Sequence, residues 1–508
     1  MLIVAGVVAL IPIVVILIKL KTSIWILLPI SWHLVGRLGW LPLPFTVRDL
    51  CFMAVILTFL IFFATRVVPF KRKIGTLDYF IYINLIYLLV VYIRNPVGFW
   101  AIQTSMVGGR PYFEVVLAVG AFSVLSRVVI GDVLARFVPL FFVVPAWGIA
   151  FLDLFSRVFP QLAYPLASFY SGVGTSSLGG AYGEQAIVGE SRIPGMQFAG
   201  TSSVLALCAK YNPTTLISPL YPARMILLGA AFGAIFLSGF RSALLFALTT
   251  LLMATLLRRR WRDLWITGSI MLLVIVALIS LQGSLIQLPR TMQRALSWMP
   301  GDWDQAAVYD AESSSQWRFE MWTWAWNDDR ILRDRVWGQG FGLSIEDMSL
   351  ISTSILAGQG GSGLLGGSDR ENFMITGAFH SGPLSTIKYV GIVGLCLYFP
   401  LICYMALLAW RLCRSAYGTK AFTLSLFVGI PIIYEPFNFV FIFGALDSGY
   451  PQMLFWAGLL NMTRNYLDAV AVKPRDPISS SQENMVSWRP AFARSLSGVE
   501  RVARGSAV

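Results

Sequence analysis

Long apolar runs separated by short clusters of charged residues make up most of the chain. Most of these runs approach the roughly 20 residues that an α-helix needs to cross the hydrocarbon core of a bilayer. The pattern therefore predicts an all-α fold, a polytopic transmembrane helical bundle with about 12 to 13 spans. We expect spans at residues 2–18, 23–41, 49–65, 76–93, 113–126, 136–155, 195–210, 223–238, 241–257, 264–282, 383–410, 421–443 and 451–467.

The composition agrees with a chain whose solvent is lipid. Hydrophobic residues make up 56% of the sequence and charged residues 13%, and the mean hydropathy is +0.70. A water-soluble domain needs far less apolar material to fill its core. The net charge of +13 does not indicate a nucleic-acid partner, because the basic residues lie beside the apolar runs instead of forming one basic domain. Membrane lipids are the expected surroundings.

Five cysteines are scattered through apolar segments without a CxxC pair, and the chain has only two histidines. This pattern indicates neither a zinc site nor a disulfide framework. We interpret the cysteines as small apolar residues, at positions Cys51, Cys208, Cys396, Cys403 and Cys413.

Clusters of Lys and Arg in short loops predict which helix ends face the cytoplasm, because basic residues resist translocation. The clusters are "RVVPFKRK" (66–73), "RRRWR" (258–262), "RLCRSAYGTK" (411–420) and the tail after residue 470. Two long segments, 155–194 and 283–382, then fall on the opposite side, and the second contains 12 acidic and 7 basic residues. The run 2–18 lacks a signal-peptide cleavage site, so we expect it to remain as a span with an external N-terminus.

The chain divides into two parts by composition. Residues 1–470 are predicted to form one transmembrane domain that includes the periplasmic loop 283–382. Residues 471–508 are rich in Ser, Arg and Pro and lack apolar periodicity, which predicts a disordered basic tail in the cytoplasm.

The long external loop contains a tryptophan-rich stretch, "SSSQWRFEMWTWAWNDDRILRDRVW" (313–337). Trp322 and Trp326 are spaced i, i+4 and would share one helical face. Such a helix fits the membrane interface, where tryptophan is enriched, and anchoring the loop there is a sufficient explanation for these residues. The glycine-rich stretches that follow, 338–342 and 358–369, lack the context of a nucleotide-binding fingerprint.

Three polar residues stand where an external loop meets a span: Arg241, Arg318 and His380. Each has an ordinary explanation, since Arg241 can reach lipid phosphate, Arg318 can anchor at the interface and His380 can be a hydrogen-bonded loop residue. Together they provide two guanidinium groups and one group that accepts a proton near neutral pH. A transfer from a diphosphate donor requires this set, because the arginines neutralise the leaving diphosphate and the histidine acts as a general base.

Two further sets of acidic residues have alternative interpretations. Asp302 and Asp304 form a DxD pair. Soluble nucleotide-sugar transferases often hold a divalent metal with such a pair, but the sequence around this one has no supporting strand or glycine-rich context. Glu114 and Glu435 are near or within spans and can contact a sugar or an acceptor. Glu435 precedes Pro436 and can equally cap a broken helix.

The order of these motifs resembles that of the superfamily of O-antigen ligases and Wzy-type O-antigen polymerases, over roughly residues 190 to 465. An Arg follows "LSG" at Ser238 to Arg241, Arg318 precedes Trp322 and "WGQGFG" (337–342), and His380 precedes a span with Gly391 and Gly394. "RIPGMQFAG" also matches an Arg-x-x-Gly entry into a span, at Arg192 and Gly195. The chain departs from the family pattern at Phe240, Ser381 and Lys388-Tyr389.

The resemblance implies a GT-C-like membrane glycosyltransferase of the bacterial inner membrane. Its donor would be a glycan on undecaprenyl diphosphate, its acceptor a hydroxyl of a glycan or lipid on the periplasmic side, and it would use no metal or other cofactor. In this reading Arg241 and Arg318 bind the diphosphate, Arg192 is a further phosphate contact and His380 is the base. The sequence does not distinguish a polymerase from a ligase. The competing hypothesis is a polysaccharide or lipid transporter, although no internal repeat is found.

Overall fold

The computed structural model describes residues 21–41, 45–66, 74–97, 108–172, 193–283, 299–343, 374–377 and 379–472, with a few positions between 285 and 297. Four expectations lie outside these residues: the span at 2–18, the role of Arg192, the glycine-rich stretch 358–369 and the disordered tail beyond residue 472. The chain forms two compact units, Met1–Leu467 and Asp468–Val508. In the second unit only the end of the last helix is described.

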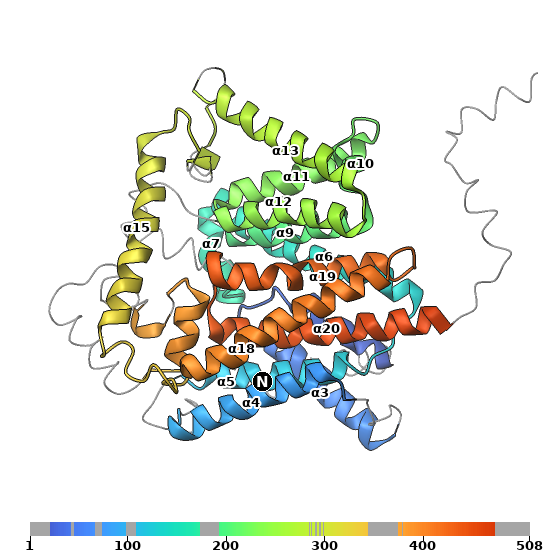
Figure 1. Ribbon diagram of the computed structural model, residues 1–508, viewed down its shortest axis with the longest axis vertical. Helices are drawn as coiled ribbons and strands as arrows, with labels where there is room; N and C mark the ends of the chain where they lie inside the picture. The colour runs from blue at the N-terminus through green and yellow to red at the C-terminus, as the bar shows by residue number, and fades with distance from the viewer. Residues whose placement is uncertain are drawn as a thin grey trace, which may run out of the picture. The chain divides into compact units, whose positions relative to one another are not determined.

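The described residues are helical apart from loops and two isolated bridges, so the predicted all-α bundle is confirmed. The expected spans from residue 49 onward coincide with helices to within a few residues (Figure 1). The elements are η1 (Lys21–Ile26), α2 (Leu27–Ser31), α3 (Val47–Ala64), α4 (Thr76–Arg94), α5 (Arg110–Leu125), α6 (Asp132–Val158), α7 (Pro160–Phe169), α9 (Pro194–Lys210), α10 (Pro213–Ile217), α11 (Pro222–Ser238), α12 (Arg241–Leu257), α13 (Trp261–Leu281), α15 (Gln305–Asn327), α18 (Gly382–Ser415), α19 (Phe422–Phe437), η4 (Asn438–Ile442) and α20 (Leu446–Val472).

Six of the described helices are long and apolar enough to cross a membrane by length and composition. They are Val47–Ala64, Thr76–Arg94, Asp132–Val158, Trp261–Leu281, Gly382–Ser415 and Phe422–Ile442, and two shorter apolar helices are Pro222–Ser238 and Arg241–Leu257. Their outer faces are apolar too, since Ile86, Ile226 and Leu273 are each more than 60% exposed. The chain is therefore a multi-pass membrane protein.

The expected span at 23–41 is not one helix. The α2 helix ends at Ser31, and the following residues turn back along the start of α3. The Val47 amide donates to the Gly36 carbonyl (2.9 Å) and the Arg48 amide to the Leu34 carbonyl (3.0 Å). Glycine and polar residues interrupt this apolar run, and the exposed backbone groups find partners in the neighbouring segment instead of in a helix.

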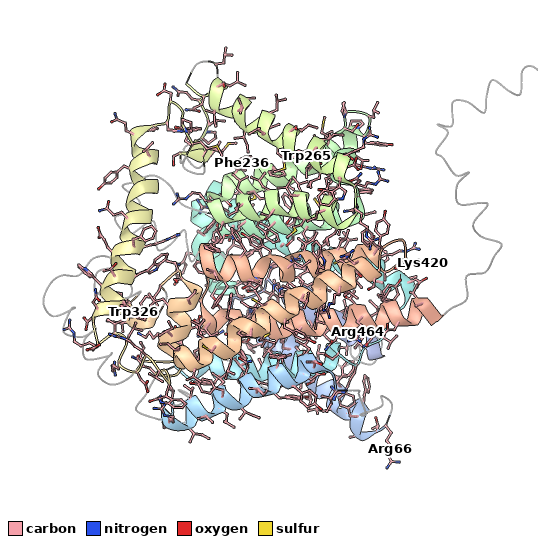
Figure 2. The ribbon with its side chains drawn as sticks, viewed as in Figure 1. Arg66, Phe236, Trp265, Trp326, Lys420 and Arg464 are labelled. Atoms are coloured by element: carbon pink, nitrogen blue, oxygen red, sulfur yellow. The ribbon has the colours of Figure 1, made fainter. Side chains whose placement is uncertain are left out.

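The described residues of the basic clusters lie at one end of the bundle, which we call the basic end. The Arg258 guanidinium donates to the carbonyl of Ala209 (2.9 Å) near the end of α9 and lies 5.7 Å from the ring centroid of Phe422, the first residue of α19. At the start of α6, the carboxylate of Asp132 accepts from the Tyr466 hydroxyl (3.1 Å). Figure 2 shows Arg66, Lys420 and Arg464 on this side and Trp326 on the other.

The long loops lie at the opposite end, which we call the loop end. There the Ile193 amide donates to the Ser238 carbonyl (3.4 Å), so the start of α9 meets the turn between α11 and α12. The Leu446 amide donates to Ser385 Oγ (3.4 Å), so the start of α20 meets the start of α18. The chain order of basic clusters and loops therefore corresponds to two opposite ends of one bundle, as the charge pattern predicts.

Accessibility of engineered cysteines to an impermeant maleimide tests this two-ended arrangement. In a background without native cysteines, Arg330→Cys at the loop end and Lys420→Cys at the basic end are expected to react under opposite conditions. One reacts in intact cells and the other only in opened membranes, because the two side chains are exposed but lie on opposite sides of the bilayer. Reaction of both cysteines in intact cells would contradict the arrangement.

Candidate functional site

The tryptophan-rich helix α15 packs against the segment that precedes His380. The Trp322 indole donates to the carbonyl of Phe379 (2.7 Å), and Met321 and Ala325 join Phe379 in one buried cluster. Arg318 lies one turn before Trp322 on the same helix. The structure thus brings the segments that bear Arg318 and His380 together at the loop end, where α15 runs across the ends of the bundle helices (Figure 1).

His380 occupies a backbone conformation that few residues other than glycine adopt. Its φ is +53°, in the left-handed region, directly before α18. The ring lies 5.0 Å from the ring of Phe443. Backbone strain of this kind persists only where surrounding contacts hold it, and it concentrates at functional sites.

Lys388 and Tyr389, which depart from the family pattern, hold the segment before His380 in place. Lys388 is 3% exposed, and its ammonium group donates to the carbonyls of Met374 (2.9 Å) and Ile375 (2.7 Å). The Tyr389 hydroxyl donates to the carbonyl of Thr376. These bonds run from the first turns of α18 back to residues 374–376, so both side chains tie the start of this helix to the segment that precedes His380.

The glycine-rich stretch after α15 pairs with a break in α18. The amides of Gln339 and Gly340 donate to the carbonyls of Lys388 (2.9 Å) and Tyr389 (2.8 Å). The break occurs at Gly391, whose φ is +71°. Two stretches are therefore adjacent in space: "WGQGFG" (337–342) and the helix that contains Gly391. Both carry part of the resemblance described above.

The backbone opposite His380 is also irregular. Between α19 and α20 the chain forms the π-helical turn η4 and then an extended stretch from Phe443 to Ala445. Gly382, two residues after His380, packs so closely on this stretch that a Cβ there would collide with Phe439. Short π-helical segments occur frequently at functional sites.

Glu435 lies directly before this irregular stretch. Its carboxylate accepts from the Asn438 side-chain amide (3.2 Å), at the first residue of η4. It also lines a cavity inside the bundle together with Gln452 and Trp456 of α20. Glu435 can therefore cap the broken helix, through its bond to Asn438, and can also contact a sugar or an acceptor in the cavity that it lines.

Arg241 is the first residue of α12 and follows the turn formed by Ser238 and Gly239. The carbonyl of Ser238 accepts from the amide of Ile193, so the start of α9 meets this turn. Helix α19 connects this region with His380. Phe246 of α12 lies 5.2 Å from Tyr434 of α19, and η4, which follows, leads to the Phe443 that contacts His380.

The structure thus joins the α15 segment that bears Arg318 to the segment that precedes His380, and the turn before Arg241 to the start of α9. All of these segments lie at the loop end around the end of α19. After α15, Arg330 hydrogen-bonds Asp328 and holds the pKa of that carboxyl below its usual range. Asp334 pairs with Arg94, the last residue of α4 (3.0 Å).

The DxD pair lies beside other loop residues. The Asp304 amide donates to Gln293 Oε1 (2.8 Å), and Asp302 lies next to Gly283. Within the described part of the chain, no group of three or more His, Cys, Asp and Glu side chains is placed to hold a metal ion.

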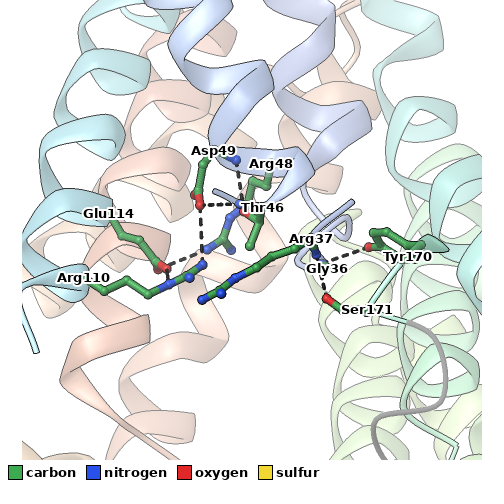
Figure 3. Close-up of polar contacts among 9 residues, drawn as sticks. All are labelled: Gly36, Arg37, Thr46, Arg48, Asp49, Arg110, Glu114, Tyr170 and Ser171. Carbon is green, nitrogen blue, oxygen red and sulfur yellow. Dashed lines mark hydrogen bonds and ion pairs between the residues drawn. The ribbon is translucent and has the colours of Figure 1, made fainter. Parts of the chain in front are cut away.

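Sequence reasoning missed an ion network that joins α3 and α5 at the loop end (Figure 3). Glu114 accepts from Arg48 (3.1 Å) and from Arg110 (3.0 Å), and Arg110 also reaches Asp49 (3.4 Å). The spacing of Arg110 and Glu114, i and i+4, and the capping box of Thr46 and Asp49 were visible signals. The sequence did not show that α3 and α5 meet at these residues.

These features define the class of the protein as a multi-pass helical membrane protein with an irregular, arginine-containing loop end. No model of a known protein family matches the chain, and no curated protein matches it either.

Substitution of Gly391 tests the pairing between α18 and the glycine-rich stretch. Gly391→Ala should destabilise the protein, because the new Cβ collides with the Val336 carbonyl and the residue keeps a positive φ. We expect a loss of about 1–3 kcal/mol from the backbone conformation and about 1–3 kcal/mol from overpacking, measured by thermal unfolding in detergent.

The matched control is Gly418→Ala, at φ +77° with open space around the added Cβ. This variant should show the backbone effect alone. Equal destabilisation by both substitutions would show that the pairing with residue 336 does not constrain the break.

Proposed function

We propose that the chain is a glycosyltransferase of the bacterial inner membrane that moves a glycan from undecaprenyl diphosphate to a hydroxyl acceptor on the periplasmic side. The observation that supports it best is the gathering of the Arg241, Arg318 and His380 segments at the end of the bundle opposite the basic clusters. With the basic end in the cytoplasm, the site faces the periplasm.

The two arginines suit a diphosphate donor. Guanidinium groups bind phosphate oxygens in pairs of hydrogen bonds and stay charged at all physiological pH values. As the bond between the anomeric carbon and the phosphate oxygen breaks, that oxygen takes the bonding electrons, and fixed positive charge stabilises them. In this mechanism Arg241 and Arg318 hold the diphosphate, with Arg192 as a further contact.

The histidine suits the acceptor. The acceptor oxygen attacks the anomeric carbon from the side opposite the diphosphate, and His380 accepts the hydroxyl proton. One direct displacement leaves the new glycosidic bond inverted. The positive φ of His380 and the bonds of Lys388 and Tyr389 to the segment before it support this role, because a general base must be held in a fixed position.

Experiments can decide two questions that this proposal leaves: whether the enzyme is a polymerase or a ligase, and whether the chain is a transferase or a transporter. A polymerase and a ligase differ in the acceptor and share the proposed chemistry. A polysaccharide or lipid transporter would remove the donor from the outer leaflet without forming a glycosidic bond, so product analysis separates it from the transferase.

Replacing His380 tests the proposed base. His380→Asn should lower turnover of a carrier-linked glycan by about 10²- to 10⁴-fold, because the variant has no group that takes up the proton. Asparagine tolerates the left-handed conformation and therefore preserves the fold. His33→Asn, at the other histidine, is the control and should retain activity. Full activity of His380→Asn would disprove the proposed base.

Replacing the arginines tests the diphosphate site. Arg241→Gln and Arg318→Gln should each lower kcat by about 10²- to 10³-fold, as expected for loss of a group that stabilises the leaving charge. Arg330→Gln at the same end should have little effect. Wild-type turnover should persist in excess chelator, and its loss there would revive the metal hypothesis for Asp302 and Asp304.

A further inference from the structure

A cavity opens at the loop end between the starts of α3, α5 and α20. Its volume is about 90 Å³, several times the roughly 10–15 Å³ that a single water molecule requires on the same measure. Part of its wall is apolar, and the remainder is formed by Arg48, Asp49, Glu114, Ser448, Gln452 and the indole of Trp32. None of these residues has a role in the proposed chemistry.

The charged part of the wall is held in a fixed arrangement (Figure 3). Asp49 is 4% exposed and caps α3 through Thr46, while Glu114 and Arg48 are 16% and 20% exposed and paired at 3.1 Å. Arg110 bridges the two carboxylates. Two guanidinium groups thus offset the two carboxylates of the network, which presents both donors and acceptors to the cavity, and the Asp447 carboxyl of α20 lies near enough to Glu114 for their charges to interact.

This balance selects the chemistry of the ligand. An anion would meet two carboxylates whose neutralising arginines are already engaged, and a cation would meet the arginines. A neutral molecule with several hydroxyl groups can donate to the carboxylates and accept from the guanidinium groups. An apolar face of the same molecule would lie against the apolar wall.

We infer that this cavity binds one neutral sugar residue of the glycan that the enzyme handles. The inference rests on the proposed function, since it names a subsite for that substrate. The opposite wall of the cavity comes from α20, where Ser448 and Gln452 are exposed and able to bond further hydroxyls. Gln452 also lines the neighbouring cavity that contains Glu435, so the two cavities adjoin.

The position relative to His380 agrees with a substrate subsite. Ser448 follows Phe443, the residue that contacts His380, by five positions in the chain. Five residues span at most about 17 Å even when fully extended. A glycan seated in the cavity therefore lies within the reach of a short saccharide from the proposed base.

A purely structural role for the network is the competing explanation, so the test uses residues outside the network. Ser448→Ala combined with Gln452→Ala removes two exposed polar groups from the cavity and leaves every ion pair intact. The probes are glucose, galactose, rhamnose and N-acetylglucosamine, each titrated into the full chain in lipid nanodiscs. Binding is followed by saturation-transfer NMR.

We expect at least one of these sugars to bind saturably to the wild type and at least about tenfold more weakly to the double variant, as for loss of two hydrogen bonds. Ser168→Ala, an exposed serine at the loop end outside the cavity, should bind as the wild type does. Absence of saturable binding by all four sugars, equal binding by the double variant, or displacement by inorganic phosphate would each overturn the inference.

Turnover separates failure of this inference from failure of the proposed function. If the wild type does not transfer a carrier-linked glycan, the proposed function fails, whatever the sugars do. If it does transfer the glycan and the double variant shows unchanged KM values for donor and acceptor, only the sugar subsite is wrong.

Discussion

Backbone amide and carbonyl groups inside a bilayer have no water to bind, so every departure from helical geometry needs a protein partner. In the described residues, the largest departures within the helical core lie at the loop end. The break at Gly391 is matched by backbone bonds to the stretch after Trp337 and by the Tyr87 hydroxyl, which donates to the Val390 carbonyl (2.9 Å). The turn between α2 and α3 is matched by bonds between the two segments. Irregular backbone, and with it the capacity to place polar side chains, is therefore concentrated at one end of the bundle.

The same constraint governs the charged side chains at that end. A charge near hydrocarbon is costly without a partner, and the Arg48, Arg110 and Glu114 network shows one solution, in which opposite charges on two helices are paired. Lys388 shows another, since its ammonium group is satisfied by two main-chain carbonyls. In both cases the charge fixes neighbouring segments relative to each other. Polar residues here act first as ties between helices, and the geometry that they impose is what a catalytic site requires.

Apolar run length predicted most helices, because a bilayer span depends on local composition alone. The run 23–41 failed because the backbone bonds between Gly36 and Val47 cannot be read from hydropathy. The clusters of Lys and Arg predicted which loops lie at the same end of the bundle. Consecutive spans run in opposite directions, so alternate loops share an end. Motif order placed Arg318 near His380, but the bond from Trp322 to Phe379 that joins their segments spans 57 residues and has no local signal. The ion network was missed for the same reason, because Arg48 and Glu114 meet only in the folded bundle.

The manner in which α15 is attached bears on how a large, lipid-linked substrate would reach such a site. Among its described side chains, Met321, Trp322 and Ala325 contact the segment before His380. His380 itself contacts the ring of Phe443, and the next helix, α18, is tied to the segment before His380 by Lys388. On the proposed function, the base and the inferred sugar subsite thus belong to the bundle, whereas one of the residues that bind the diphosphate, Arg318, belongs to the loop helix. A donor that enters from the bilayer would complete the site by bridging these two parts, and this division explains why a long external loop is needed for a reaction that otherwise uses only residues at helix ends.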